Sequence, residues 1–317
     1  MAKILANDGI SAQGVDALLS YGYEVSTTNV AQEQLENHIN KNKFDVLLVR
    51  SATTVRRDFI DACPSLKIIG RGGVGMDNID VEYARKKGLH VINTPAASSA
   101  SVAELVFAHL YGGVRYLFDA NRQMPLEGDT KFKVLKKNYA GGSELRGKTL
   151  GLIGFGRIGQ ETAKIAFGVG MNVVVHDLFM DKAEVKLILG NGAEVNVDIE
   201  MKSLESVLKE ADFVSLHVPA QDKPVIGQKE LSIMKKGSGL INAARGGVID
   251  EDALLDALDN GHLSFAGLDT FINEPKPAMK VLMHPSVSLT PHIGAATQEA
   301  QDRIGIELAQ QIHAILG

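Results

Sequence analysis

The sequence contains one cysteine, Cys63, and no tryptophan. A single cysteine cannot form a disulfide within the chain, and it excludes a metal site built from several cysteines. No apolar run approaches the roughly 18 residues that a membrane-spanning helix requires. The first residues also lack the charged, apolar and cleavage regions of a secretory signal. These absences lead us to expect a cytoplasmic protein with no metal site and no contact with membranes.

Positive charge is in the minority: 33 Lys and Arg residues stand against 38 Asp and Glu residues, and the formal net charge is −5. Such a chain has no general attraction to nucleic acid or anionic lipid, so any site for an anion must be local. Hydrophobic residues make up 45% of the chain, which indicates a globular protein with a sizeable core. The length of 317 residues suggests about two domains.

Three glycines in the stretch Leu150–Gln160 follow the spacing G-x-G-x-x-G, between an apolar strand-like segment and a helical one. In this context Gly154 permits a tight turn, Gly156 lets a pyrophosphate approach the backbone, and Gly159 lets the helix pack closely. A second predicted strand leads to Asp177, 18 residues after Gly159, near the ~20 expected of an acid that binds the adenosine ribose. A glycine-rich surface turn would not explain this context. Because a carboxylate repels the 2′-phosphate of NADP, the motif favours NAD.

Strand-like and helix-like segments alternate along the chain, which predicts an α/β fold of doubly wound parallel sheets with crossover helices. The segments before residue 98 form one such unit, and those from residue 149 onward form another. The last amphipathic segment, Thr297–Leu316, follows the final strand, and we expect it to pack back on the first unit. We therefore predict a discontinuous domain of residues 1–98 and 292–317, and a second domain of residues 99–291.

Three segments of the second domain carry weaker patterns. Residues 98–123 have helical periodicity interrupted at Gly112–Gly113, and we predict one long connecting helix there. Residues 124–148 are polar and basic, and their length exceeds that of a simple connection. We expect this segment to be an arm that contacts a second subunit. Residues 193–197 are expected to add a strand to the sheet of the second domain.

Six motifs occur in the order and spacing of one enzyme family. They are Arg71–Asp80, Asn93–Glu104, Gly154–Gly159, Asn242–Leu254, Gly267–Pro275 and Thr290–Thr297. Together they resemble the D-isomer-specific 2-hydroxyacid dehydrogenases, and the resemblance extends over nearly the whole chain. It implies two βαβ domains, a Rossmann-type domain for NAD and a flavodoxin-like domain for the substrate, with NAD bound in the cleft.

Within this family, the stretch Asp45–Ile60 and the first motif are most similar to the members that oxidise 3-phospho-D-glycerate on the route to serine. The resemblance thus implies a phosphorylated 2-hydroxy acid as substrate and a homodimer. We expect the short form, without the C-terminal regulatory domain of longer members. A reductase of another small D-2-hydroxy acid, such as glyoxylate or hydroxypyruvate, stays open. An NAD-sensing protein similar to the transcriptional corepressors of this fold is a further alternative.

The resemblance also implies three catalytic residues: His292 as acid/base, Glu274 as its partner and Arg245 as the substrate anchor. Oxidation of a secondary alcohol removes a proton from oxygen as hydride leaves carbon, and imidazole can accept that proton near neutral pH. A carboxylate on the other ring nitrogen fixes the tautomer, and a guanidinium can bind a carboxylate through two parallel hydrogen bonds. Taken singly, each of the three could equally be structural: a packed histidine, a turn residue and a surface charge.

The remaining site residues carry over from the matching motif positions. The expected cofactor contacts are Val74, Gly154, Gly156, Arg157, Ile158, Gly159, Asp177, His217, Val218, Pro219, Ala243, Ala244, Arg245, Asp269, His292, Gly294 and Ala295. The expected substrate contacts are Arg50, Ser51, Arg71, Val74, Gly75, Asn93, Arg245 and His292. Arg50 and Arg71 each follow an apolar strand, and ligands gather where parallel strands end, so both are candidates for binding a phosphate.

Overall fold

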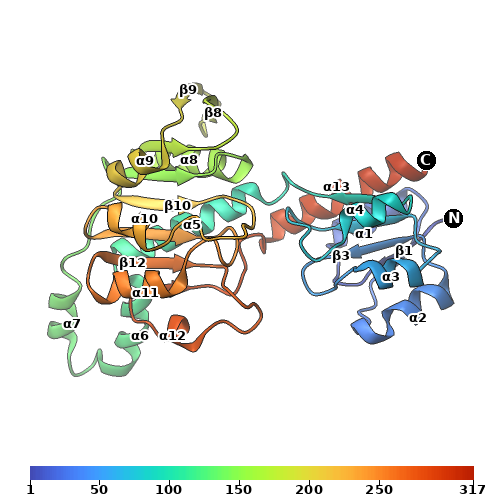
Figure 1. Cartoon of the computed structure of the whole chain (residues 1–317), viewed down its shortest axis with the longest axis horizontal. Helices are drawn as coiled ribbons and strands as arrows, with labels where there is room; N and C mark the ends of the chain where they lie inside the picture. Colours follow the sequence, from blue (N-terminus) through green and yellow to red (C-terminus); the bar gives the residue numbers. More distant parts are fainter. The chain divides into compact units, whose positions relative to one another are not determined.

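Two parallel sheets organise the chain, each inside its own unit of the computed structural model, which describes residues 1–317. The first unit comprises residues 1–101 and 295–317, and the second unit comprises residues 102–294 (Figure 1). The boundaries that we predicted at residues 98 and 292 lie three residues away from these. No helix combines the length and apolar character that crossing a membrane would require.

The first unit holds a five-stranded parallel sheet in the order β2-β1-β3-β4-β5, which is the flavodoxin-like order. Its strands are β1 (Lys3–Ala6), β2 (Glu24–Ser26), β3 (Val46–Val49), β4 (Ile68–Arg71) and β5 (His90–Asn93). Its helices are α1 (Ala12–Ser20), α2 (Gln32–Asn42), α3 (Arg57–Ala62), α4 (Val81–Lys86) and α13 (Gln298–Leu316). Alternate residues of β3 belong to different core clusters, with Leu47 in one and Leu48 in the other, because helices cover both faces.

The second unit holds a six-stranded parallel sheet in the order β13-β12-β11-β10-β6-β7. Its strands are β6 (Thr149–Ile153), β7 (Asn172–His176), β10 (Phe213–Leu216), β11 (Ser238–Asn242), β12 (Leu263–Leu268) and β13 (Val287–Leu289). Its helices are α5 (Ser99–Val114), α6 (Leu117–Glu127), α7 (Phe132–Asn138), α8 (Arg157–Val169), α9 (Leu204–Glu210), α10 (Gln228–Ile233), α11 (Glu251–Asp259) and α12 (Met279–Leu282). The predicted α/β class, with two doubly wound parallel sheets, is confirmed.

A separate hairpin follows β7. Strands β8 (Lys182–Ile188) and β9 (Glu194–Glu200) pair antiparallel with each other and form a two-stranded sheet of their own. Our prediction that residues 193–197 extend the large parallel sheet was therefore wrong. Both strands alternate mostly exposed residues with a few buried ones, so only one face of the hairpin packs on the second unit, where Val185, Leu187 and Ile199 join a core cluster.

The long connecting helix is broken, but not at its glycine pair. Gly112–Gly113 lie inside α5, where a side chain on Gly113 would collide with the ring of Phe265. The break comes at Tyr116, whose φ of 54° is left-handed. The residues after it form α6 and α7, which Figure 1 shows projecting from the second unit. Most of α6 lies in the predicted long helix, and α7 lies in the predicted arm.

Close contact between two helices attaches α13 to the first unit. A Cβ on Gly14 of α1 would lie 2.7 Å from the Cα of Gly305, and a Cβ on Gly305 would lie 2.8 Å from the Cα of Gly14. The backbones of α1 and α13 can approach this far only because neither residue has a side chain. On the next turns of α13, Ile304, Leu308 and Ile312 are buried against the sheet.

We predict that Gly305→Ala destabilises the protein by about 1–3 kcal/mol, the usual penalty for overpacking, because a methyl group there must push the two helices apart. Gly168→Ala is the matched control, since Gly168 also lies in a helix but has no atom near its missing side chain. We expect the control to stabilise by roughly 0.5–1 kcal/mol. Chemical denaturation followed by circular dichroism measures both, and equal stability of the two variants would contradict the packing argument.

Candidate active site

The glycine turn lies between β6 and α8. Two of its glycines are required by the chain itself: a Cβ on Gly154 would lie 2.6 Å from the carbonyl oxygen of His217, and one on Gly159 would lie 2.5 Å from that of Gly154. Gly154 also has a positive φ of 91°. Gly156 differs, because nothing lies within 4 Å of its missing side chain. Open space thus adjoins the backbone at the position where the motif predicts a pyrophosphate.

The start of α8 offers backbone donors beside this space. Arg157 and Ile158 begin the helix, and no side chain caps its first turn. The N–H groups of such a turn have no partner inside the helix and favour an anion. Asp177 follows β7 and accepts hydrogen bonds from the backbone nitrogens of Phe155 (2.7 Å) and Phe179 (2.8 Å). It therefore fixes the glycine turn from the neighbouring strand.

His217, Val218 and Pro219 come directly after β10, next to the glycine turn. The Nε2 atom of His217 is buried and has no hydrogen-bond partner in the chain. Desolvation lowers the pKa of His217 to about 3, so the ring is neutral at physiological pH. A buried ring nitrogen without a partner is unfavourable, so this position fits a contact with a bound group.

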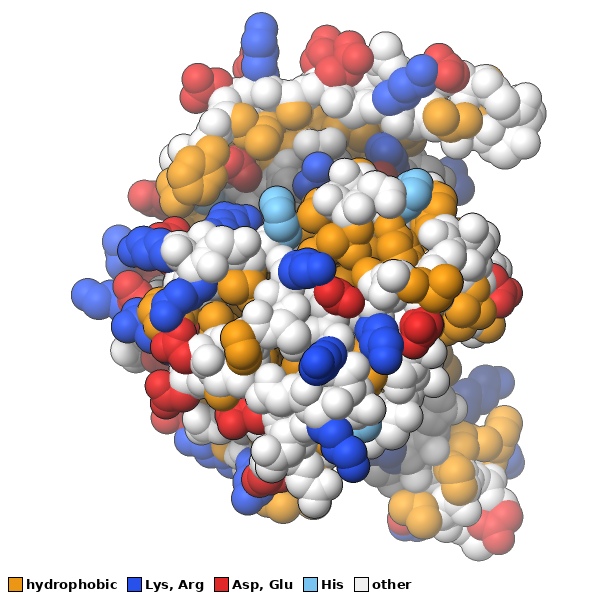
Figure 2. All heavy atoms as spheres, turned by 90° about the vertical axis from the view of Figure 1, so that its right-hand side faces the viewer, with side chains coloured by type: hydrophobic (Ala, Val, Ile, Leu, Met, Phe, Trp, Pro, Cys, Tyr) orange, Lys and Arg blue, Asp and Glu red, His pale blue; other side chains and the backbone are white.

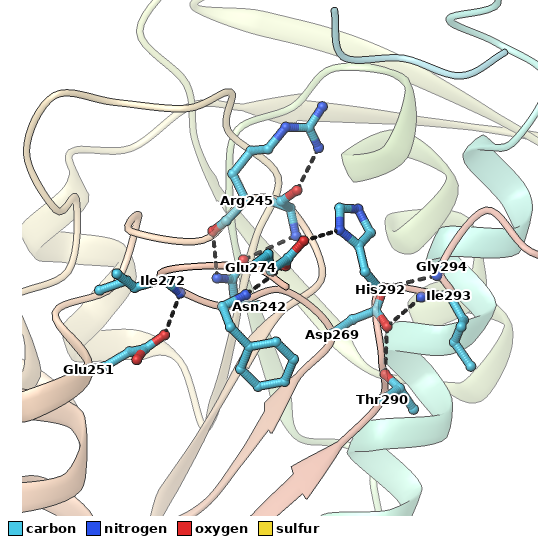
Figure 3. A network of polar contacts seen from close by, with 12 residues as sticks. Asn242, Arg245, Glu251, Asp269, Ile272, Glu274, Thr290, His292, Ile293 and Gly294 are labelled. Carbon is cyan, nitrogen blue, oxygen red and sulfur yellow. Dashed lines mark hydrogen bonds and ion pairs between the residues drawn. The ribbon is translucent and has the colours of Figure 1, made fainter. Parts of the chain in front are cut away.

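The structure brings His292 and Glu274 together. The Nδ1 atom of His292 lies 2.8 Å from Oε2 of Glu274, and the other carboxylate oxygen accepts from the backbone nitrogen of Phe271 at 2.9 Å (Figure 3). Because an ionised carboxylate can only accept, Nδ1 of His292 carries a hydrogen and Nε2 is the basic nitrogen of the neutral ring. Both side chains are partly exposed, so Nε2 can meet a substrate.

The loop that carries Glu274 is braced from two sides. Glu251, at the start of α11, accepts from the backbone nitrogen of Ile272 at 2.7 Å, and burial raises its pKa. From the other side, a Cβ on Gly246 would lie 1.9 Å from the carbonyl oxygen of Phe271. The group that approaches the backbone at Gly246 is therefore this loop of the chain itself.

Arg245 lies in the turn after β11, between the buried Ala243–Ala244 pair and Gly246. Asn242 shapes this turn, because its amide donates to the carbonyl of Arg245 at 2.8 Å. The guanidinium donates to the carbonyl of Ala244 at 2.6 Å. Three neighbouring strand exits thus supply the predicted catalytic residues, since Arg245 follows β11, Glu274 follows β12 and His292 follows β13.

Asp269 follows β12, and its carboxylate holds the turn that contains His292. It accepts hydrogen bonds from the hydroxyl of Thr290 (2.6 Å) and from the backbone nitrogens of Ile293 and Gly294 (2.8 Å each), as Figure 3 shows. Three of its roughly four acceptor positions are therefore used inside the chain. The fourth is left for a donor outside the chain, and Asp269 is one of the residues predicted to contact the cofactor. Our sequence analysis did not single out Thr290 or Glu251, although both lie within the motifs that it named.

Six of the eight predicted substrate residues belong to the first unit and lie at or just after the ends of its strands; the other two, Arg245 and His292, belong to the second unit. Arg50 follows β3, while Arg71 and Asn93 are the last residues of β4 and β5, and strand pairing aligns Arg71 with Asn93. The two arginines border the same turn: a Cβ on Gly72 would lie 3.7 Å from the stem of Arg50, and one on Gly73 would lie 2.0 Å from the guanidinium of Arg71.

The same turn continues into Val74 and Gly75, whose backbone N–H groups donate no hydrogen bond within the chain. Asn93 fixes the turn by donating to the carbonyl of Val74 at 2.7 Å. On the opposite side, Asp8 accepts from the backbone nitrogen of Arg50 at 2.6 Å and so anchors the loop that continues into the exposed Ser51. Asp8 was not among the predicted residues. Ala295 belongs to this unit as well, and its carbonyl accepts from Gln301.

Elsewhere on the first unit, positive charge is not concentrated. In the face nearest the viewer in Figure 2, Lys and Arg side chains are scattered among Asp and Glu side chains. Several cations of the first unit are paired, such as Lys67 with Asp45 and Arg56 with Asp80. Arg50 and Arg71, beside the 72–75 turn, are therefore candidates for anion binding because of their position at the sheet edge. They are not part of a broad basic surface.

Comparison with known proteins agrees with this geometry. The family described as "D-isomer specific 2-hydroxyacid dehydrogenase, NAD binding domain" matches residues 107–294. Hydroxypyruvate reductase of Thermotoga maritima is 40% identical over 99% of this chain and 98% of its own. D-3-phosphoglycerate dehydrogenase of Methanocaldococcus jannaschii is 41% identical over 100% of this chain and 58% of its own. The crystal structure of TT0316 protein from Thermus thermophilus superposes with a TM-score of 0.84 at 31% identity, over 99% of this chain and 96% of that one.

The relatives that match this chain are of two kinds, some of about its own length and some much longer. The chain spans between about half and three fifths of the phosphoglycerate dehydrogenases that it resembles, and nearly all of the hydroxypyruvate reductase. The matched family segment contains the glycine turn, Asp177, Arg245, Glu274 and His292. It thus includes every residue predicted to bind the cofactor except Val74 and Ala295, and the cofactor is of the NAD type.

Proposed function

Because the chain belongs to the D-isomer-specific 2-hydroxyacid dehydrogenases, we propose that it oxidises 3-phospho-D-glycerate to 3-phosphohydroxypyruvate with NAD. The observation that carries this proposal is the hydrogen bond between His292 and Glu274 at the end of two parallel strands. It leaves a basic ring nitrogen where a hydroxyl proton can be taken up. Relatives named D-3-phosphoglycerate dehydrogenase, at about 40% identity, support the choice of substrate.

Each residue has a defined part in the reaction. Bound NAD supplies the acceptor for the hydride that leaves the alcohol carbon. Nε2 of His292 takes the hydroxyl proton, and Glu274 stabilises the resulting imidazolium through Nδ1–H. Arg245 binds the substrate carboxylate, so that the alcohol carbon is held beside His292. In the opposite direction, the imidazolium returns the proton to the carbonyl oxygen.

The residues of the second unit fit NAD. The uncapped first turn of α8 and the open space at Gly156 suit the pyrophosphate, and Asp177 lies at the strand end where the ribose is expected. The buried Nε2 atom of His217 has no partner in the chain and suits the adenosine half. A carboxylate at position 177 disfavours a 2′-phosphate, so we propose NAD in preference to NADP.

A second candidate is the reduction of hydroxypyruvate or glyoxylate. It is favoured by the Thermotoga maritima relative, which matches this chain over the full length of both. The two activities share the cofactor and His292, and they differ in whether the substrate carries a phosphate. Arg50 and Arg71, on either side of the 72–75 turn, favour the phosphorylated substrate, because a phosphate in an acidic protein needs local cations.

We further propose that the protein is a homodimer joined through α6 and α7. Apolar side chains there face solvent, with exposed fractions of 75% for Leu126, 57% for Phe132 and 54% for Val134. Solvent-exposed apolar side chains that lie close together on a projecting element typically mark a protein interface.

We predict that His292→Asn lowers kcat by about 10²–10⁴-fold, the usual loss for a general acid/base, while NADH binding stays the same.

Glu274→Gln should lower kcat by roughly 10- to 100-fold, the range of a lost supporting partner. Its amide places an oxygen at only one of the two carboxylate-oxygen positions, and the NH2 group at the other position cannot accept from Phe271 or His292. Steady-state kinetics and NADH fluorescence measure both effects. The exposed Glu82→Gln is the control, and equal kcat in it and in Glu274→Gln would exclude Glu274 from the reaction.

The choice of substrate is tested with wild-type protein, NAD and a panel of 2-hydroxy acids with and without phosphate. We predict that Arg50→Gln and Arg71→Gln each raise KM for 3-phosphoglycerate by about 10- to 100-fold, since a charge-assisted hydrogen bond contributes roughly 1.5–3 kcal/mol. KM for glycerate should change little, and Arg85→Gln should change neither value. If the wild type does not distinguish the phosphorylated acid, the hydroxypyruvate or glyoxylate reductase becomes the better assignment.

The proposed dimer is tested by placing charge on the arm. The double variant Phe132→Glu, Val134→Glu should sediment as a monomer, because burying two carboxylates in an interface is unfavourable. Ile188→Glu is the control: Ile188 is also highly exposed, but it lies on the β8–β9 hairpin. Analytical ultracentrifugation gives the masses, and a dimer that survives the double variant would move the contact elsewhere.

A further inference from the structure

A histidine that has no part in the proposed chemistry lies behind the His292 turn. His109 is in the middle of α5, with an exposed fraction of 3%. Its Nδ1 atom lies 2.9 Å from the hydroxyl of Ser288, and its Nε2 atom lies 3.0 Å from the hydroxyl of Thr290. Ser288 lies in β13 and Thr290 directly follows it, and two residues that far apart on an extended chain point to the same side, where they bind both nitrogens of one ring.

The direction of these hydrogen bonds follows from Asp269. Thr290 gives its only hydroxyl hydrogen to the Asp269 carboxylate, so its oxygen can only accept from His109. Nε2 of His109 therefore carries a hydrogen. Burial lowers the pKa of His109 and favours the neutral ring, whose Nδ1 atom then accepts from Ser288. The network thus specifies one tautomer of His109.

The chain makes room for this ring. A Cβ on Gly267, in the neighbouring strand β12, would lie 2.6 Å from Cβ and 2.8 Å from Cγ of His109. A helix residue as large as histidine can approach the sheet here only because β12 has no side chain at that point. The burial of His109 is therefore matched by a glycine opposite it, independently of the hydrogen bonds.

We propose that His109 is a positioning residue for His292. Its Nε2–H donates to the hydroxyl of Thr290, two residues before His292. Thr290 in turn donates to the Asp269 carboxylate and so orients it. That carboxylate holds the backbone nitrogens of Ile293 and Gly294, directly after His292. His292 itself has a left-handed φ of 53°, a conformation that a non-glycine residue keeps only when its surroundings fix it. The hydrogen bonds from His109 to Thr290 and from Thr290 to Asp269 supply that constraint, because they hold the chain both before and after His292.

The inference rests on the proposed function insofar as His292 is the acid/base, and its kinetic test compares two substitutions. His109→Leu removes the donor to Thr290 at similar volume, and we expect it to lower kcat by about tenfold, equivalent to about 1.4 kcal/mol of transition-state stabilisation. KM for the nicotinamide cofactor should stay within about twofold. His109→Gln keeps an N–H donor near the Nε2 position and should restore most of kcat. His262→Leu is the control, because the ring of His262 bonds to the carbonyl of Leu231, outside this network.

A second readout does not need turnover. In protein labelled with ¹⁵N at histidine, the ring nitrogens of His109 should report the tautomer with hydrogen on Nε2. The ring signals of His292 should shift in His109→Leu and return in His109→Gln. If His109→Leu does not fold, Thr290→Val breaks the same link with a side chain of similar shape. Unchanged His292 signals and unchanged kcat in these variants would overturn the inference, whereas absence of turnover in the wild type would overturn only the proposed function.

Discussion

The loops that follow the strands of the second unit depend on one constraint, the buried carboxylate of Asp269. Its exposed fraction is 1%, and a charge removed from water to this extent must be compensated by hydrogen bonds. All three donors that the chain provides come from the segment around His292, at Thr290, Ile293 and Gly294. The backbone at His292 therefore follows from the need to solvate Asp269, and the ring is left to interact with Glu274.

Contacts between backbones connect the other strand exits. The turn after β11 touches the loop after β12 at Gly246 and Phe271, and the turn after β6 touches the residues after β10 at Gly154 and His217. Such contacts leave no side chain that could change rotamer, so the relative positions of the turns are fixed more tightly than side-chain packing would fix them. Groups that must act together are thereby held by rigid strand ends, as catalysis requires.

The sequence was sufficient for the features that depend on local pattern. The alternation of strands and helices predicted both sheets, and the motif spacing predicted which residues follow each strand. It was not sufficient where tertiary contact decides. A helix does run through Gly112–Gly113, as predicted, and Gly113 makes room for the ring of Phe265, but the helix breaks at Tyr116, whose residue type carries no signal for it. Residues 193–197, in β9, resembled part of the large sheet because alternation does not identify the partner strand, which is β8.

The supporting residues of the site were missed for a similar reason. Glu251, Thr290 and His109 act on groups 21 to 181 residues away in the sequence, through hydrogen bonds that no spacing rule predicts. The helix α5 offered a sign in retrospect: a histidine among Val106, Phe107 and Leu110 is a polar group on a buried face, which must find partners there.

The discontinuity of the first unit has a consequence for how the protein is made. Helix α13 completes the core of that unit by packing on α1, yet residues 102–294 lie between the two in the sequence. A ribosome releases the N-terminal part first, so one face of the first unit's sheet is covered only in part, by residues of α1, while the whole second unit is synthesised and is able to fold. Ile4, Val46, Leu48 and Ile68 belong to that face. Until the last helix arrives, the nascent chain presents an apolar surface of the kind that chaperones recognise.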